Sequence, residues 1–154
     1  MTPSLRALLV TLSLAVSVSS ESCPSGWVAF RDSCYYRSTY TIEWETANEI
    51  CAAIQPAARQ PSVHDLVTDA FIAETLLGGD RAWLGLSRVD GVWSWSDGSA
   101  DDWHYWYCDQ PGATGDACVI TNYAGTGKWA TYRCDDPHYF VCQVHAANVT
   151  ATAV

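Results

Sequence analysis

The sequence predicts a disulfide-stapled α+β domain. Two segments, 41–51 and 62–79, carry apolar residues at helical spacing, and the chain after them consists of short apolar runs broken by Gly, Asp and Asn. Helices followed by a strand-rich half are typical of the α+β class. The chain also has 7 cysteines behind an export-type leader, which indicates three disulfides and one thiol left over.

The leader covers residues 1–20, where one Arg precedes a short apolar run and small residues follow. This layout is typical of a secretory signal peptide, so we expect a secreted, extracellular protein. No later stretch approaches the roughly 20 apolar residues of a transmembrane helix, and no membrane insertion is expected. Residues 21–145 are predicted to form one domain, and the small, polar residues 146–154 a flexible tail. The tail's "NVT" makes Asn148 an N-glycosylation acceptor.

The charge balance is acidic, with 17 Asp and Glu against 8 Lys and Arg and a net charge of −9. Such a surface repels nucleic acid and anionic membranes, so neither is an expected partner.

The first element after the leader is a predicted hairpin. "SCPSGWVAFRDSCYY" contains two short aromatic and β-branched runs separated by turn residues, with Cys23 and Cys34 placed to tie them. The next segment, "TIEWETANEIC", sets Trp44, Ala47 and Cys51 on one helical face. We therefore expect a first helix anchored by a disulfide.

A second helix is predicted from "SVHDLVTDAFIAETLLGG". Ser62 is its expected N-cap, with Asp65 three residues later as a variant capping box. Gly78 and Gly79 end it, because glycine accepts the left-handed conformation of a helix C-terminus. Its inward-facing stripe is predicted to comprise Leu66, Ala70, Phe71 and either Leu76 or Leu77.

The motifs of the chain, in their order and spacing, resemble the C-type lectin-like domain, in its long form, over essentially the whole mature chain. The matching motifs are "CYY" at Cys34, the Trp44 helix, "WLGL" at Trp83, "WSWSDGS" at Trp93, then Trp129 and "FVC" ending at Cys142. Six cysteines allow 15 pairings. The resemblance implies one of them: Cys23–Cys34, Cys51–Cys142 and Cys118–Cys134.

The resemblance also supplies a test for calcium. In sugar-binding members, five side chains around a Glu-Pro-Asn or Gln-Pro-Asp loop hold the main calcium ion. The corresponding residues here are Gln110, Gly112, Asp116, Ala130 and Thr131. Calcium needs six to eight oxygen ligands, and only Gln110 and Asp116 remain convincing ones. At the auxiliary site, Arg88 falls near a position that often carries an acid, and its charge repels a cation. We expect no calcium cofactor, although nearby acids leave open a weak site of different geometry.

Two functions remain open. In the first, the protein is a lectin-like binder of glycans through the long loop, with Asp109, Gln110 and Asp116 as hydrogen-bonding groups and Trp106 or Trp129 as stacking surfaces. The family's tryptophan at the position of Trp129 is, however, largely core. Alternatively, the fold contacts a protein or another surface without metal, as calcium-independent relatives do.

The odd cysteine, Cys108, has two alternative fates. It forms a disulfide to a second chain, giving a homodimer, or it is a buried free thiol.

Enzymatic chemistry is not expected. The chain has no nucleophile elbow or phosphate-binding loop. A zinc site can be drawn from His104, Cys108, His138 and His145, but four ligands must converge and secreted thiolates usually oxidise first. His64, beside Asp65, is expected at the surface. The sequence therefore predicts a non-catalytic recognition domain.

Overall fold

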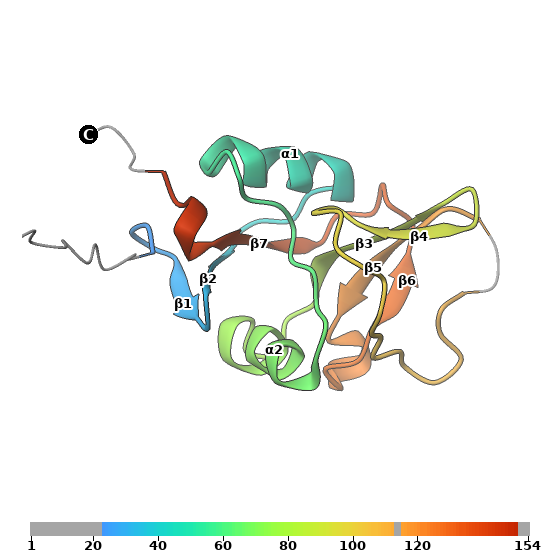
Figure 1. Ribbon diagram of the computed structural model, residues 1–154. Helices are drawn as coiled ribbons and strands as arrows, with labels where there is room; N and C mark the ends of the chain where they lie inside the picture. Colours follow the sequence, from blue (N-terminus) through green and yellow to red (C-terminus); the bar gives the residue numbers. More distant parts are fainter. Residues whose placement is uncertain (1–22, 113–114, 151–154) are drawn as a thin grey trace, which may run out of the picture.

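The computed structural model describes residues 23–112 and 115–150, and these form the predicted α+β fold (Figure 1). Its strands form a sheet in the order β1-β2-β7-β3-β5-β6, with β4 paired to β3. The strands are β1 (Val28–Phe30), β2 (Ser33–Arg37), β3 (Ala82–Val89), β4 (Val92–Trp95), β5 (Ala117–Thr121), β6 (Ala130–Tyr132) and β7 (Tyr139–His145). In Figure 1, helix α1 (Trp44–Ile54) lies above the β2–β7 pair and α2 (Leu66–Ala70) lies below it.

The two ends of the domain are joined by strand pairing. Antiparallel pairing of β2 with β7 sets Ser33 opposite His145 and Arg37 opposite Val141. The predicted hairpin is present as β1–β2, with β1 at the edge of the sheet. Cys23, which precedes β1, is bonded to Cys34 in β2. Because β2 and β7 are paired, the chain segment that connects them begins and ends beside this strand pair.

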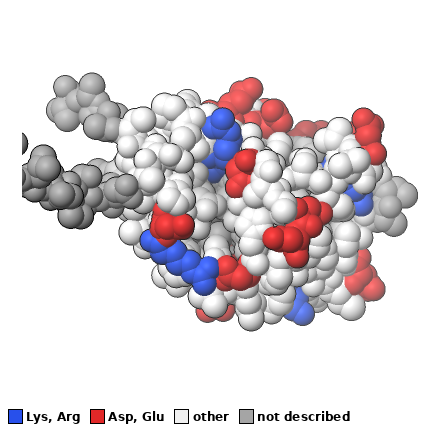
Figure 2. Space-filling view, viewed as in Figure 1, with Lys and Arg blue, Asp and Glu red and all other residues white. Residues whose placement is uncertain are grey.

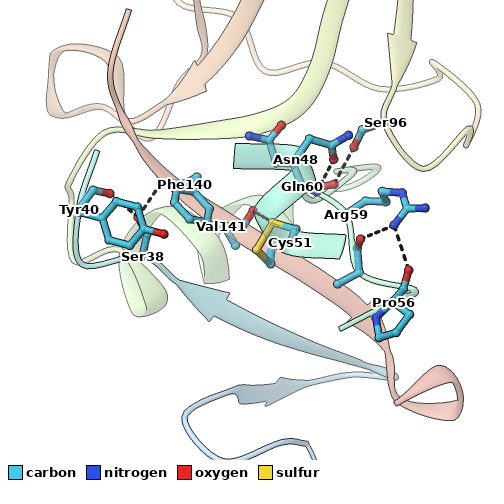
Figure 3. Close-up of a disulfide and its surroundings, with 12 residues drawn as sticks. Ser38, Tyr40, Asn48, Cys51, Pro56, Arg59, Gln60, Ser96, Phe140 and Val141 are labelled. Carbon is cyan, nitrogen blue, oxygen red and sulfur yellow. Dashed lines mark hydrogen bonds between the residues drawn. A yellow bond between two sulfur atoms is a disulfide. The ribbon is translucent and has the colours of Figure 1, made fainter. Parts of the chain in front are cut away.

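All three predicted disulfides are present: Cys23–Cys34, Cys51–Cys142 and Cys118–Cys134. Cys51–Cys142 joins residues 91 apart in the sequence. Figure 3 shows the Cys51 sulfur between α1 and β7, beside Val141. Closing a loop of this length stabilises the fold by on the order of 4 kcal/mol in the chain-entropy model.

Helix α1 buries the predicted face, Trp44, Ala47 and Cys51. The Trp44 indole Nε1 donates a hydrogen bond of 2.8 Å to the Leu84 carbonyl in β3. The helix is therefore attached to the sheet by a disulfide at one position and by a buried hydrogen bond at another.

Helix α2 starts three residues later than one capped by Ser62 would. Its N-cap is Asp65, whose Oδ1 accepts from the backbone N–H groups of Val67 and Thr68, both at 2.9 Å. Ser62 instead donates to Asp97. The prediction of Leu66 as an inward residue is wrong, since it is 54% exposed.

Leu66 is exposed because the helix starts later than predicted and because its second half, Phe71–Leu76, has π-helical turns, which shift the buried face. The buried residues are Phe71, Ile72, Ala73 and Leu77.

The domain extends past the predicted boundary at residue 145. Ala146–Asn148 form a 3-10 turn, and Val149 packs against the core. The buried Gln55 side chain accepts from the Thr150 backbone N–H at 3.2 Å and from its hydroxyl at 3.0 Å. These contacts replace the predicted tail up to residue 150, while Asn148 itself is exposed, as a glycan acceptor requires.

Two sequence predictions fall on parts of the chain outside the described residues, namely the signal peptide at 1–20 and the last four residues. Between residues 23 and 150, none of the described helices has the length and apolar character that crossing a membrane requires.

Two buried glutamines provide a test of the core. Gln60 is 1% exposed and neither its Oε1 nor its Nε2 has a hydrogen-bond partner, whereas Gln55 is 2% exposed and bonded to Thr150. We predict that Gln60→Leu raises the free energy of unfolding by about 1–3 kcal/mol, because it removes an unpaired buried amide. The matched change Gln55→Leu should lower it by a similar amount. Urea denaturation of both variants measures this, and destabilisation by Gln60→Leu would contradict the prediction.

Candidate functional site

The long loop between β4 and β5, residues 96–116, carries all of the predicted ligand-binding residues except Trp129, which precedes β6. One segment of it runs beside Trp129: the Tyr107 N–H donates to the Trp129 carbonyl and the Trp129 N–H to the Tyr105 carbonyl, each at 2.8 Å. This pairing attaches the middle of an otherwise irregular loop to the start of β6.

The structure contradicts the interpretation of Trp129 as a stacking surface. Its side chain is 0% exposed, and its Nε1 donates to Asp69 Oδ1 at 2.7 Å. A wholly buried ring cannot stack on a ligand. Trp106 is only half-buried, with its ring 5.7 Å from that of Trp129 and 5.4 Å from that of Trp93. Trp106 therefore remains the one candidate stacking surface of the two.

Gln110 is held by Thr131. The Gln110 Oε1 accepts from both the backbone N–H and the hydroxyl of Thr131, each at 3.0 Å. That hydroxyl oxygen in turn accepts from the Gly112 N–H at 3.0 Å. A Cβ at position 112 would lie 2.9 Å from the same oxygen, so the Thr131 hydroxyl fills the space in which a side chain at 112 would begin. The Gln110–Pro111 peptide is cis.

The remaining predicted residues lie around this group. Asp116 is exposed and its Oδ1 accepts from the Asp90 N–H at 3.1 Å. A cavity of about 200 Å³ lies between Asp116 and Thr131, and the described residues that line it are Arg88, Asp116, Ala117, Thr131, Tyr132 and Arg133. Asp109 is exposed at the 107–110 turn and, like Trp106 and Gln110, is not among these lining residues. Gln110 and Asp116 are thus related only through Thr131, which bonds to Gln110 and lines the cavity with Asp116.

These residues do not fit the family's main calcium site. An amide oxygen has two lone pairs, and both of those of Gln110 are directed at donors of Thr131. Gly112 and Ala130 offer no side-chain oxygen. Within residues 23–112 and 115–150, no three His, Cys, Asp or Glu side chains converge as metal ligands. The histidines drawn as a zinc site are also dispersed, since His104 is bonded to Asp101 and His145 to Asp32.

Cys108 is exposed and forms no disulfide with any cysteine of the described chain. It lies in the turn in which the Gln110 N–H donates to the Tyr107 carbonyl. Of the two fates open from the sequence, the buried thiol is therefore wrong, and the thiol is accessible at the surface.

A second polar cluster, missed by the sequence analysis, joins the segment before α2 to the long loop. His64 Nδ1 lies 2.6 Å from Asp102 Oδ1, and its Nε2 lies 3.1 Å from Ser99 Oγ. This order of groups resembles a catalytic triad, but the Ser99 hydroxyl donates its only proton to Asp97 at 2.6 Å. His64 thus has no serine proton to accept, which nucleophilic catalysis requires. The hydrogen bonds of this cluster join the segment before α2 to the long loop.

This chain is similar in sequence and in structure to known proteins. The sequence profile of the family described as "Lectin C-type domain" matches residues 40–144. "Lectin BRA-3" of Megabalanus rosa is 31% identical over 120 residues, covering 75% of this chain and 74% of that protein. A "C-type lectin galactose-binding isoform" of Hoplocephalus stephensii is 34% identical over 119 residues, covering 69% and 75%. The solved structure of a calcium-independent type II antifreeze protein superposes with a TM-score of 0.73 at 26% identity, covering 80% of this chain and 95% of that one.

The buried Asp69 beneath the long loop predicts a pH dependence. Burial raises its pKa from 3.8 to about 6, against the hydrogen bond from Trp129 and with the help of the Glu74 charge. The folded state then binds the proton more tightly than the unfolded state, so this group's contribution to stability falls as the pH rises from about 4 to 6. We predict that Asp69→Asn, which keeps an acceptor for Trp129, stabilises the protein at pH 7 by roughly 1–3 kcal/mol and has no effect below pH 4.

Asp65→Asn is the control, and its expected effect on stability has the opposite sign. Burial alone would raise the pKa of Asp65, but hydrogen bonds from Thr68 and Arg31 lower it to about 2. Asp65→Asn should therefore destabilise at neutral pH, with the difference vanishing as the pH falls toward 2. Thermal melts from pH 2 to 8 measure both, and a pH-independent effect of Asp69→Asn would refute the assignment.

Proposed function

The chain belongs to the lectin C-type domain family, and from this premise we propose that it is a secreted, non-catalytic protein that binds carbohydrate through its long loop without calcium. The observation that carries the proposal is the Gln110–Thr131 pair, in which protein donors occupy the amide oxygen that would otherwise face the ion. The loop therefore holds its shape by internal hydrogen bonds.

Carbohydrate binding is supported by the relatives and by the groups that remain accessible. One relative is named as galactose-binding, and the Gln110–Pro111 pair matches the galactose-type form of the family's motif. The Gln110 Nε2 makes no hydrogen bond within the described residues, and the carboxylates of Asp109 and Asp116 are exposed. These groups supply one donor and two acceptors for sugar hydroxyls, and half-buried Trp106 supplies an apolar face for a sugar ring.

Calcium independence has a direct test. We predict that calorimetric titration with calcium shows no one-to-one binding tighter than about 1 mM. On a glycan array, the same glycans should bind in calcium and in chelator.

Gln110→Ala and Asp116→Ala should each weaken glycan binding about five- to tenfold, since each removes a hydrogen-bonding group. Asp32→Asn, on the β1–β2 turn, serves as the control. Glycan binding that disappears in chelator would overturn calcium independence, and an array with no bound glycan would favour the protein- or surface-binding alternative.

We also propose that Cys108 links two copies of the chain, since it is the one cysteine of the described residues outside the three disulfides and its side chain is exposed. In an oxidising compartment an accessible thiol finds a partner, and a second copy offers an identical one.

We predict that the protein secreted by cultured cells runs at twice the mass of the mature chain without reductant and at the mass of the mature chain with it. Cys108→Ser should run at the chain mass in both conditions. Wild-type protein at monomer mass in both lanes would exclude the intermolecular bond.

A further inference from the structure

Arg88 is a buried cation beside the candidate site, and no acid among the described residues forms an ion pair with it. It lies in β3, opposite Ala117 of β5 and Trp93 of β4, and is 9% exposed. None of the ion pairs formed among the described residues includes it. Burying a guanidinium without an anion is costly, because the charge loses its hydration.

The contacts of the guanidinium leave hydrogen-bonding capacity unused. Its Nε donates to the Gly115 carbonyl at 2.9 Å, and its Cζ lies 5.0 Å from the centre of the Trp93 ring. Its Nη2 is buried and has no hydrogen-bond partner. The carbonyl and the ring hold the fork in one orientation, and neither supplies a negative charge.

Arg88 opens onto the 200 Å³ cavity that also contains Arg133, Thr131 and Asp116. Arg133 is exposed and paired with Asp135, an interaction that is weak at a surface and can give way to another partner. Its charge and that of Arg88 exceed the one carboxylate, Asp116, in the lining. Figure 2 shows Asp and Glu spread over the face that it presents, with fewer Lys and Arg, so an excess of positive lining is a local departure from an acidic surface.

We propose that this cavity binds an oxyanion carried by the saccharide ligand, a sulfate ester or a carboxylate, with Arg88 as the principal contact. The inference rests on the proposed carbohydrate binding and specifies its ligand class. A guanidinium presents parallel N–H donors that match the oxygens of a carboxylate or sulfate, and an anion in this cavity would supply the negative charge that the contacts of Arg88 lack. The cation that other members obtain from a metal is here supplied by a side chain.

The test compares three probes by calorimetry in chelator: methyl galactoside, its 3-O-sulfate and methyl galacturonide. Wild-type protein should bind at least one of the charged probes about tenfold or more tightly than the neutral one, and which of them it prefers identifies the anion. Arg88→Gln should abolish the difference, while Asp116→Asn should enlarge it by removing a like charge. Arg31→Gln, on the β1–β2 turn, is the matched control.

Because Arg88 is buried, Arg133→Gln provides a second variant at an exposed position, and a thermal melt checks the folding of each. If Arg88→Gln does not fold, weaker binding of the charged probe by Arg133→Gln and tighter binding by Asp116→Asn decide in favour. Equal affinity for charged and neutral probes would overturn the oxyanion site and leave the proposed function standing. Titration with inorganic sulfate shows whether the proposed carbohydrate binding fails by itself. If sulfate binds through Arg88 and no saccharide binds, the carbohydrate proposal alone is overturned.

Discussion

The pairing of β2 with β7 is the constraint on which the rest of the structure depends. It holds Ser33–Arg37 against the last strand of the domain, and Cys51–Cys142 attaches α1 to the same strand. With its ends joined by backbone hydrogen bonds and a covalent link, the chain between them is a closed loop that loses little entropy on folding. The described residues of the long loop, 96–112 and 115–116, can therefore have little regular structure and still keep one position.

Hydrogen bonds connect the residues of this chain that correspond to the calcium ligands of other family members. A calcium ion gathers side-chain oxygens from several segments around one centre. Here the Thr131 hydroxyl gathers Gln110 and Gly112 instead, donating to one and accepting from the other. The two departures from the family's motif, Gly112 and Thr131, are physically coupled, because the Thr131 hydroxyl fits only where residue 112 lacks a side chain. Gly112 and Thr131 thus read as a matched pair and not as two independent losses.

The cysteine framework and the first helix could be predicted because their signals are local or come from a family pattern with fixed order. The start of α2 could not, since Ser62 and Asp65 are both good N-caps and a distant partner, Asp97, takes Ser62. The sequence proposed residues for the candidate site, and the structure removed Trp129 from them and showed connections that the sequence did not indicate. Nothing near Gln110 in the sequence shows that its side-chain oxygen accepts two hydrogen bonds from a residue 21 positions away. Likewise, the lack of an ion-pair partner for Arg88 depends on the packing of three strands.

Trp129 holds the long loop on the domain. Its backbone pairs with residues 105 and 107, while the rings of Trp95, Trp103 and Trp106 meet it edge-on at 5.4–5.8 Å. An indole buried this deeply needs a partner for its N–H, and Asp69 from α2 supplies it. The cost is a buried carboxyl whose pKa is raised to about 6. One aromatic cluster therefore connects α2, the long loop and β6, so that apolar packing and the Trp129–Asp69 hydrogen bond hold the loop that carries Gln110 and Asp116.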